Sequence, residues 1–281
     1  MNASQKQSSA IAKYTAMHES GCFVLPNPWD AGTAVYLERL GFEAVATTSA
    51  GFAFSRALPD SVTAVSRGMM LQHIGEVAEA TTLPVNADFQ NGYADEPEGV
   101  ATSVALCIVT GVAGLSIEDS TGDDAKPLYD FSLAVERIKA ARAAVDNSKV
   151  PVVLTGRCEA WLVGHADPAR VAIERLVAYA EAGADCLYAP GASEPKDIEA
   201  IVKAVSPKPV NVLVSSSNAD LSVSRLADLG VRRISVGGAL ARVAWGAFMR
   251  AAKSIKETGT FETFDDAAPF NEIQDLFLKR Q

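Results

Sequence analysis

The amino-acid sequence predicts an α/β fold of the (β/α)8 barrel type, formed by residues 1–281 as one domain. Short apolar runs typical of parallel strands alternate with amphipathic helical runs, giving eight strand-helix units along the chain. Polar residues follow nearly every predicted strand, which suits a ring of loops around one mouth of a barrel. A doubly wound open sheet is the alternative, and it explains the polar strand ends less well.

The predicted strands are short and apolar, and cover residues 22–25, 44–48, 83–88, 114–118, 151–155, 185–189, 210–214 and 231–236. The predicted helices follow them, and cover residues 31–40, 63–80, 96–110, 132–145, 168–182, 195–205, 221–229 and 237–256. Residues 52–60 are expected to be irregular. Pro97 suits the first turn of its helix, because the N–H that proline lacks has no partner there.

The two ends of the chain fall outside the eight units. Residues 1–10 are polar and are predicted to form a flexible tail. Residues 257–281 are predicted to be a polar linker followed by an extra helix, residues 269–279. This helix could pack on a partner subunit or cover its own barrel, and the sequence leaves both open.

Composition narrows the class of protein. The formal net charge is −9 and no basic patch is visible, which argues against nucleic-acid binding. No run is long enough to span a membrane, and the first residues lack a signal-peptide core. The cysteines have no metal or redox spacing and are expected to be reduced thiols, so we expect a cytoplasmic protein; they are Cys22, Cys107, Cys158 and Cys186.

Two acids at consecutive strand ends suggest a metal site. Asp88 ends one strand, just before the polar loop of residues 89–93, and Glu118 ends the next. Carboxylates from neighbouring strand ends can share one divalent cation, and hard oxygen ligands without nearby His or Cys favour Mg²⁺. Helix caps or surface ion pairs are the alternative for either acid alone.

The residues just after the predicted strands would all face one mouth of the barrel: Asn27, Trp29, Asp30, Ser49, Ala50, Gly51, Asp88, Asn91, Glu118, Asp119, Arg157, Glu159, Asn211, Ser235, Gly237 and Gly238. The run 49–51 offers a hydroxyl and backbone N–H groups to an oxyanion. Arg157 can hold a carboxylate through two hydrogen bonds. The alternative is a structural ion pair with Glu159, Glu118 or Asp119.

Several chemistries lack the residues that they need. No lysine lies within or ends a predicted strand, which argues against a Schiff-base aldolase. No Ser-His-Asp arrangement is evident, and no dinucleotide-type glycine fingerprint follows the first strand.

Eight segments together resemble the isocitrate lyase/phosphoenolpyruvate mutase superfamily in order and spacing. They are the sequences at residues 27–30, 48–51, 58–60, 87–93, 117–119, 156–160, 211–213 and 234–238. The resemblance implies a barrel whose eighth helix is exchanged between paired subunits, usually in a homotetramer formed as a dimer of dimers. It also implies Mg²⁺, with Mn²⁺ as a substitute, and a small 2-oxo acid or dicarboxylate as substrate.

The same resemblance assigns roles to residues of this chain. Asp88 matches the direct metal ligand, and Asp60 and Glu118 match acids that hold the metal largely through water. The predicted substrate-binding residues are Trp29, Ser49, Ala50, Gly51, Asp88, Arg157 and Asn211, with Trp29 as an aromatic wall. The predicted catalytic residues are Arg157, Lys126 and Asp60.

The loop of residues 120–130 departs from the family pattern. It lacks the Lys-Lys-Cys-Gly-His motif of isocitrate-type lyases and the asparagine of the mutases, and only Lys126 matches in part. The proton donor is therefore sought among Lys126, Asp123, Asp124 and Tyr129, in a loop that closes over the substrate about Gly122. A disordered surface loop is the alternative.

We therefore predict a Mg²⁺-dependent lyase that cleaves a C–C bond next to a 2-oxo acid through a pyruvate-like enolate. Oxaloacetate decarboxylation or hydrolysis and the cleavage of a substituted malate are examples. One alternative is a mutase or hydrolase acting on the P–C bond of phosphonopyruvate. An alternative of another class is a non-catalytic barrel that binds a dicarboxylate.

Overall fold

A computed structural model of the chain describes residues 3–278. The strands are β1 (Phe23–Leu25), β2 (Val45–Ala46), β3 (Val85–Asp88), β4 (Gly114–Glu118), β5 (Val153–Arg157), β6 (Cys186–Tyr188), β7 (Val210–Leu213) and β8 (Arg233–Ser235). The helices are α1 (Ala3–Met17), α2 (Ala31–Arg39), α3 (Ser49–Ser55), α4 (Arg67–Ala80), α5 (Pro97–Ile108), α6 (Phe131–Ser148), α7 (Pro168–Glu181), α8 (Pro195–Val205), α9 (Val223–Asp228), α10 (Ala239–Thr258), the 3-10 helix η1 (Glu262–Asp266) and α11 (Phe270–Leu278).

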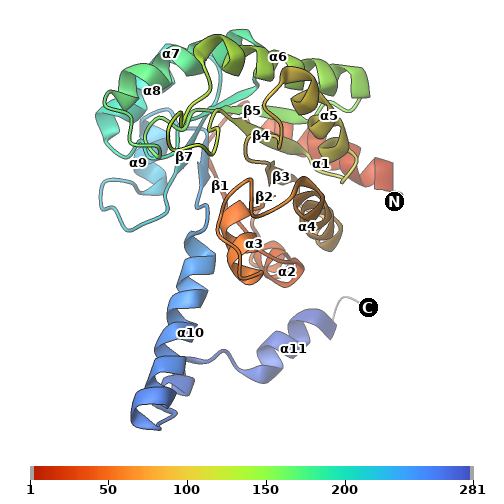
Figure 1. The fold of residues 1–281 in the computed structure, drawn as a ribbon. Coiled ribbons are helices and arrows are strands. Elements are labelled where there is room, and N and C mark those ends of the chain that lie inside the picture. The colour runs from red at the N-terminus through yellow and green to blue at the C-terminus, as the bar shows by residue number, and fades with distance from the viewer. Residues whose placement is uncertain (1–2, 279–281) are drawn as a thin grey trace.

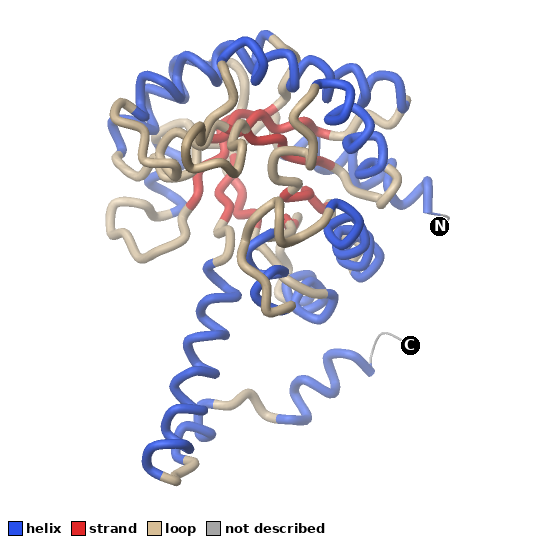
Figure 2. Tube along the Cα trace, in the orientation of Figure 1, coloured by secondary structure: helices blue, strands red, loops and turns tan. Residues whose placement is uncertain are grey.

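The strands form a nearly closed parallel barrel. Their order is β1-β8-β7-β6-β5-β4-β3-β2, and the two ends of this order are joined where Ala46 N donates to Pro26 O at 3.0 Å. Helices surround the strands (Figure 1), and the strands lie together at the centre (Figure 2). The predicted (β/α)8 barrel is confirmed, and the carboxyl ends of all eight strands meet at one mouth.

Local capping explains where several helices begin. The Asp30 side chain accepts from Thr33 N at 2.7 Å and forms a capping box at the start of α2. Thr48 caps α3, a helix that covers residues 52–55 of the segment predicted to be irregular. Ser66 caps α4, which therefore begins at Arg67 and not at residue 63 as predicted.

The prediction of a flexible tail over residues 1–10 is wrong for residues 3–10, and residues 1–2 lie outside the described chain. The helix α1 packs on the barrel, with Tyr14 fully buried. Its Gln7 Nε2 donates to Ile108 O at 2.8 Å and to Val112 O at 3.0 Å. The helix is held by these tertiary contacts, because its own residues are mostly polar and form only a weak apolar stripe.

The helix α10 projects away from the barrel instead of covering it (Figure 1). The chain then turns through η1 into α11, where Phe277 lies 3.4 Å from the position of a Cβ on Gly32 of α2. The predicted extra C-terminal helix is thus confirmed as far as Leu278, and Lys279 lies outside the described residues. Within residues 3–278, no helix has both the length and the apolar character needed to cross a membrane.

Candidate active site at the carboxyl ends of the strands

A small cavity of about 140 Å³ lies at the mouth of the barrel. A larger outer cavity of about 650 Å³ lies between it and the loop of residues 120–130. The two cavities share Ser49, Asp60 and Arg157 as lining residues. The two cavities are therefore adjacent, and the loop of residues 120–130 lines the outer one.

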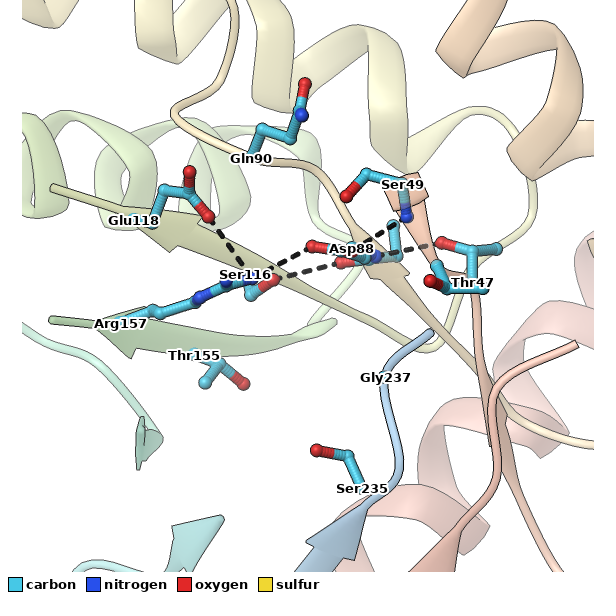
Figure 3. A network of polar contacts seen from close by, with 12 residues as sticks. Thr47, Ser49, Asp88, Gln90, Ser116, Glu118, Thr155, Arg157, Ser235 and Gly237 are labelled. Atoms are coloured by element: carbon cyan, nitrogen blue, oxygen red, sulfur yellow. Dashed lines mark hydrogen bonds and ion pairs between the residues drawn. The ribbon is translucent and has the colours of Figure 1, made fainter. Parts of the chain in front are cut away.

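Arg157 is the centre of the charged cluster, as Figure 3 shows. Its Nη1 lies 3.1 Å from Asp88 Oδ1 and 3.1 Å from Glu118 Oε2, and its Nε donates to Glu159. Burial disfavours its charge, but the carboxylates of Glu118, Glu159 and Asp88 hold the Arg157 pKa well above its usual range. The sequence offered a substrate-binding or an ion-pair role for Arg157, and the structure shows the ion pairs with Glu118 and Glu159.

Backbone and hydroxyl groups hold Asp88 in place. Its N–H donates to Thr47 Oγ1 at 2.9 Å, and its Oδ2 accepts from Ser49 N at 2.9 Å. The Ser49 N–H is available because Ser49 begins α3, where the first N–H groups have no partner within the helix. One carboxylate oxygen thus faces α3 and the other faces Arg157.

Asp60 and Glu118 stand on either side of Gln90. Gln90 Nε2 donates to Asp60 Oδ1 at 3.2 Å, and the backbone carbonyl of Gln90 accepts from Glu118 N at 3.0 Å. Partial desolvation at the rim of the cavity and the charge of Asp88 raise the pKa of Asp60, although the residue as a whole is exposed. Burial also raises the pKa of Glu118, and Arg157 offsets part of this effect.

These carboxylates form a donor set that suits Mg²⁺. Asp88 and Glu118 both contact the guanidinium of Arg157, and all the candidate ligands are hard oxygens. In the described part of the chain, no three His, Cys, Asp or Glu side chains gather closely enough to bind a metal ion together. The arrangement fits an ion that takes one carboxylate directly and keeps several waters, as Mg²⁺ does.

The remaining predicted residues divide into three groups. Ala50 and Asn211 line the inner cavity, and Asn211 Nδ2 donates to Ser235 Oγ at 2.9 Å. Gly51 and Trp29 lie behind this lining, where a Cβ on Gly51 would be 2.8 Å from Trp29 Cβ. Lys126 lies outside both cavities: its side chain is 60% exposed and pairs with Asp130 at 2.6 Å.

Two other residues proposed from the sequence belong to the scaffold. Asp119 accepts from Arg175 Nη1 at 3.0 Å and from Tyr179 OH at 2.7 Å, so it faces α7 and not the cavity. The Tyr129 hydroxyl donates to Asp95 and is buried away from both cavities. Asp123 and Asp124 do line the outer cavity.

Several lining residues escaped the sequence interpretation, among them Thr47, Tyr188 and Arg233. Arg233 had a detectable signal, because alternation along a strand places it on the same face as the polar Ser235 two residues later. Thr47 and Tyr188 lie inside predicted strands, where a lone polar or aromatic residue does not stand out.

A barrel that gathers acids and an arginine around one cavity at its carboxyl mouth defines an enzyme of the (β/α)8 class. Residues 14–256 match the family described as phosphoenolpyruvate phosphomutase. The chain belongs to this family, and so to the isocitrate lyase/phosphoenolpyruvate mutase superfamily of Mg²⁺-dependent lyases and mutases, as the sequence predicted.

The chain is also similar to individual proteins and solved structures. A solved structure from Burkholderia cenocepacia J2315 is 46% identical, with a TM-score of 0.93 over 97% of each chain. The protein named "Probable 2-methylisocitrate lyase 2" of Corynebacterium glutamicum is 30% identical over 84% of this chain and 76% of its own length. A phosphonopyruvate hydrolase solved with oxalate and Mg²⁺ is 25% identical, with a TM-score of 0.81 over 100% of this chain and 96% of its own.

Proposed function

We propose that this protein is a Mg²⁺-dependent lyase that cleaves a C–C bond next to the carbonyl of a 2-oxo acid, or of a hydroxy acid that gives one. The observation that carries the proposal is that Asp88 and Arg157 line the same small cavity. A 2-oxo acid has a carboxylate that suits Arg157 and two adjacent oxygens that suit a metal held by Asp88. Oxalate, which the phosphonopyruvate hydrolase binds with Mg²⁺, has the same pair of adjacent oxygens.

Different residues of the chain have different roles in the proposed reaction. Asp88 would hold Mg²⁺ directly, with Asp60 and Glu118 holding its waters, and the bound ion supplies Lewis-acid stabilisation of an enolate. Arg157 binds and orients the substrate carboxylate, and Ser49 lines the same cavity. The loop of residues 120–130 excludes water when it closes; Gly122, at φ +78°, is placed to act as its hinge.

The outer cavity favours C–C over P–C cleavage. A phosphonate carries more negative charge than a carboxylate and calls for extra cations around it. The outer cavity instead presents Asp123 and Asp124, and Arg157 is the single cationic side chain among its described lining residues. We therefore place phosphonopyruvate second, and a non-catalytic dicarboxylate-binding barrel third.

Proton and phosphorus NMR of the purified protein tests the proposal. The substrates are oxaloacetate, substituted malates and phosphonopyruvate, each with and without Mg²⁺. We expect Mg²⁺-dependent formation of pyruvate or another 2-oxo acid from a carbon substrate. Phosphate or phosphoenolpyruvate from phosphonopyruvate alone would move the assignment to P–C chemistry. Mg²⁺-dependent oxalate binding without any turnover would favour the non-catalytic reading.

The role of Lys126 as proton donor can be tested by Lys126→Met. Because Lys126 lies outside both cavities in an exposed ion pair, we expect kcat to fall by less than about 3-fold and stability to change by less than about 0.5 kcal/mol. Steady-state kinetics and thermal unfolding provide the measurements. A loss of kcat near 100-fold would instead show that loop closure carries Lys126 into the site.

We also propose that α10 pairs with a second copy of the chain, as the sequence resemblance implies. Val243, Trp245, Phe248 and Met249 are between 40% and 70% exposed on this projecting helix. Size-exclusion chromatography with light scattering should find an oligomer for the native chain and a smaller species for Phe248→Glu. Val109→Glu is the matched control, since Val109 is 79% exposed on the barrel itself. An unchanged mass for Phe248→Glu would contradict the pairing.

A further inference from the structure

Arg233 is a buried arginine in the wall of the inner cavity, with 2% of its surface exposed. All its hydrogen bonds go to uncharged groups. Nε donates to Asn211 Oδ1 at 2.9 Å, Nη1 to Tyr14 OH at 2.9 Å and Nη2 to Thr155 Oγ1 at 3.0 Å. Among residues 3–278, no carboxylate forms an ion pair with it.

The neighbouring groups that could titrate do not cancel this charge. His18 Nε2 lies 3.3 Å from Nη1, and burial together with the Arg233 charge lowers the pKa of His18 to about 3. Burial raises the pKa of Tyr14 to about 12. Burial also raises the pKa of the neighbouring Cys186, so all three side chains are neutral near pH 7 and the guanidinium contributes one uncompensated positive charge.

The two cavity arginines therefore differ in how their charge is used. Arg157 touches three carboxylates, whereas Arg233 touches none. The carboxylates around the inner cavity repel an anionic ligand, and Arg157 is already shared among them. The charge of Arg233 remains available to offset this repulsion, and a low-dielectric wall strengthens its effect.

The bond to Thr155 places this charge one step deeper in the barrel than Arg157. Thr155, its partner on β5, lies two residues before Arg157 and so on the same inward face (Figure 3). Asn211 bonds to both Arg233 and Ser235, and all three residues line the cavity. Burying an unpaired charge is costly, which calls for a compensating partner in the cavity.

We propose that Arg233 is a positioning and specificity residue, whose unpaired charge makes the cavity prefer a doubly charged ligand over a singly charged one of the same shape. The inference rests on the proposed function only in taking the inner cavity as the place where the substrate anion binds. The alternative is a structural role, in which Arg233 ties α1 to the barrel through Tyr14 and His18.

Oxalate and oxamate separate these roles, because they have nearly the same shape and differ by one charge near pH 7. Calorimetry with Mg²⁺ would measure both affinities for the native chain, Arg233→Met and Arg233→Lys. We expect the native chain to prefer oxalate, Arg233→Met to lose about 10-fold of that preference, and Arg233→Lys to retain it. Arg233→Gln is the second neutral variant if the methionine variant does not fold, since its amide can still bond to Asn211 or Thr155.

Equal losses for oxalate and oxamate in the neutral variants would overturn the inference and leave Arg233 a structural residue. A native chain that binds both ligands equally would also overturn it, without any variant. These outcomes are distinct from failure of the proposed function, which would appear as no Mg²⁺-dependent binding of oxalate to the native chain.

Discussion

Asp88→Asn is expected to abolish most Mg²⁺-dependent turnover while leaving the fold intact. The amide keeps the size of the side chain and can still accept from Ser49 N. It removes the charge that would hold the metal directly, and metal stabilisation of transition-state charge is worth several kcal/mol, so kcat/KM should fall by about 10³-fold. Steady-state kinetics with Mg²⁺ titration gives this number.

The metal affinity provides a second measurement on the same variant. Calorimetry should show Mg²⁺ binding weakened by at least about 100-fold in Asp88→Asn. Asp130→Asn is the control, because the Asp130 side chain is 67% exposed and pairs with Lys126 outside the cavities. Unchanged Mg²⁺ affinity in Asp88→Asn would show that the metal assignment is wrong.

Asp119→Ala is expected to lower the free energy of unfolding by about 3–5 kcal/mol. The Asp119 carboxylate is 2% exposed and accepts from Arg175, Tyr179 and the backbone N–H of Glu159. Truncation leaves the Arg175 charge buried without its partner, which costs more than the loss of an exposed ion pair. Urea denaturation followed by circular dichroism measures the change.

The adjacent acid should behave in the opposite way. Glu118 faces the cavity, and in Glu118→Gln the Arg157 side chain keeps Asp88 and Glu159 as charged partners. Stability should therefore change by less than about 1 kcal/mol, while Mg²⁺-dependent activity falls. If Asp119→Ala proved as stable as Glu118→Gln, the division between scaffold and site would be wrong.

The contrast between Glu118 and Asp119 shows what the sequence alone can and cannot predict. Glu118 and Asp119 are neighbours in the chain, and both were placed at the mouth because both follow a predicted strand. Alternation along a strand puts them on opposite sides, but the register needed to tell them apart comes from pairing with β5. Only the packing of α7 shows that Arg175 and Tyr179 donate hydrogen bonds to the Asp119 carboxylate.

The amino-acid sequence by itself determined the barrel and most of the cavity wall, because the alternation of strands and helices is local and the ends of parallel strands must converge. Asp88, Glu118 and Arg157 could be grouped for this reason. The tertiary structure decided what no local pattern contains: the docking of α1, the projection of α10 and the unpaired charge of Arg233. Each depends on contacts between residues far apart in the chain, such as the bond from Arg233 to Tyr14.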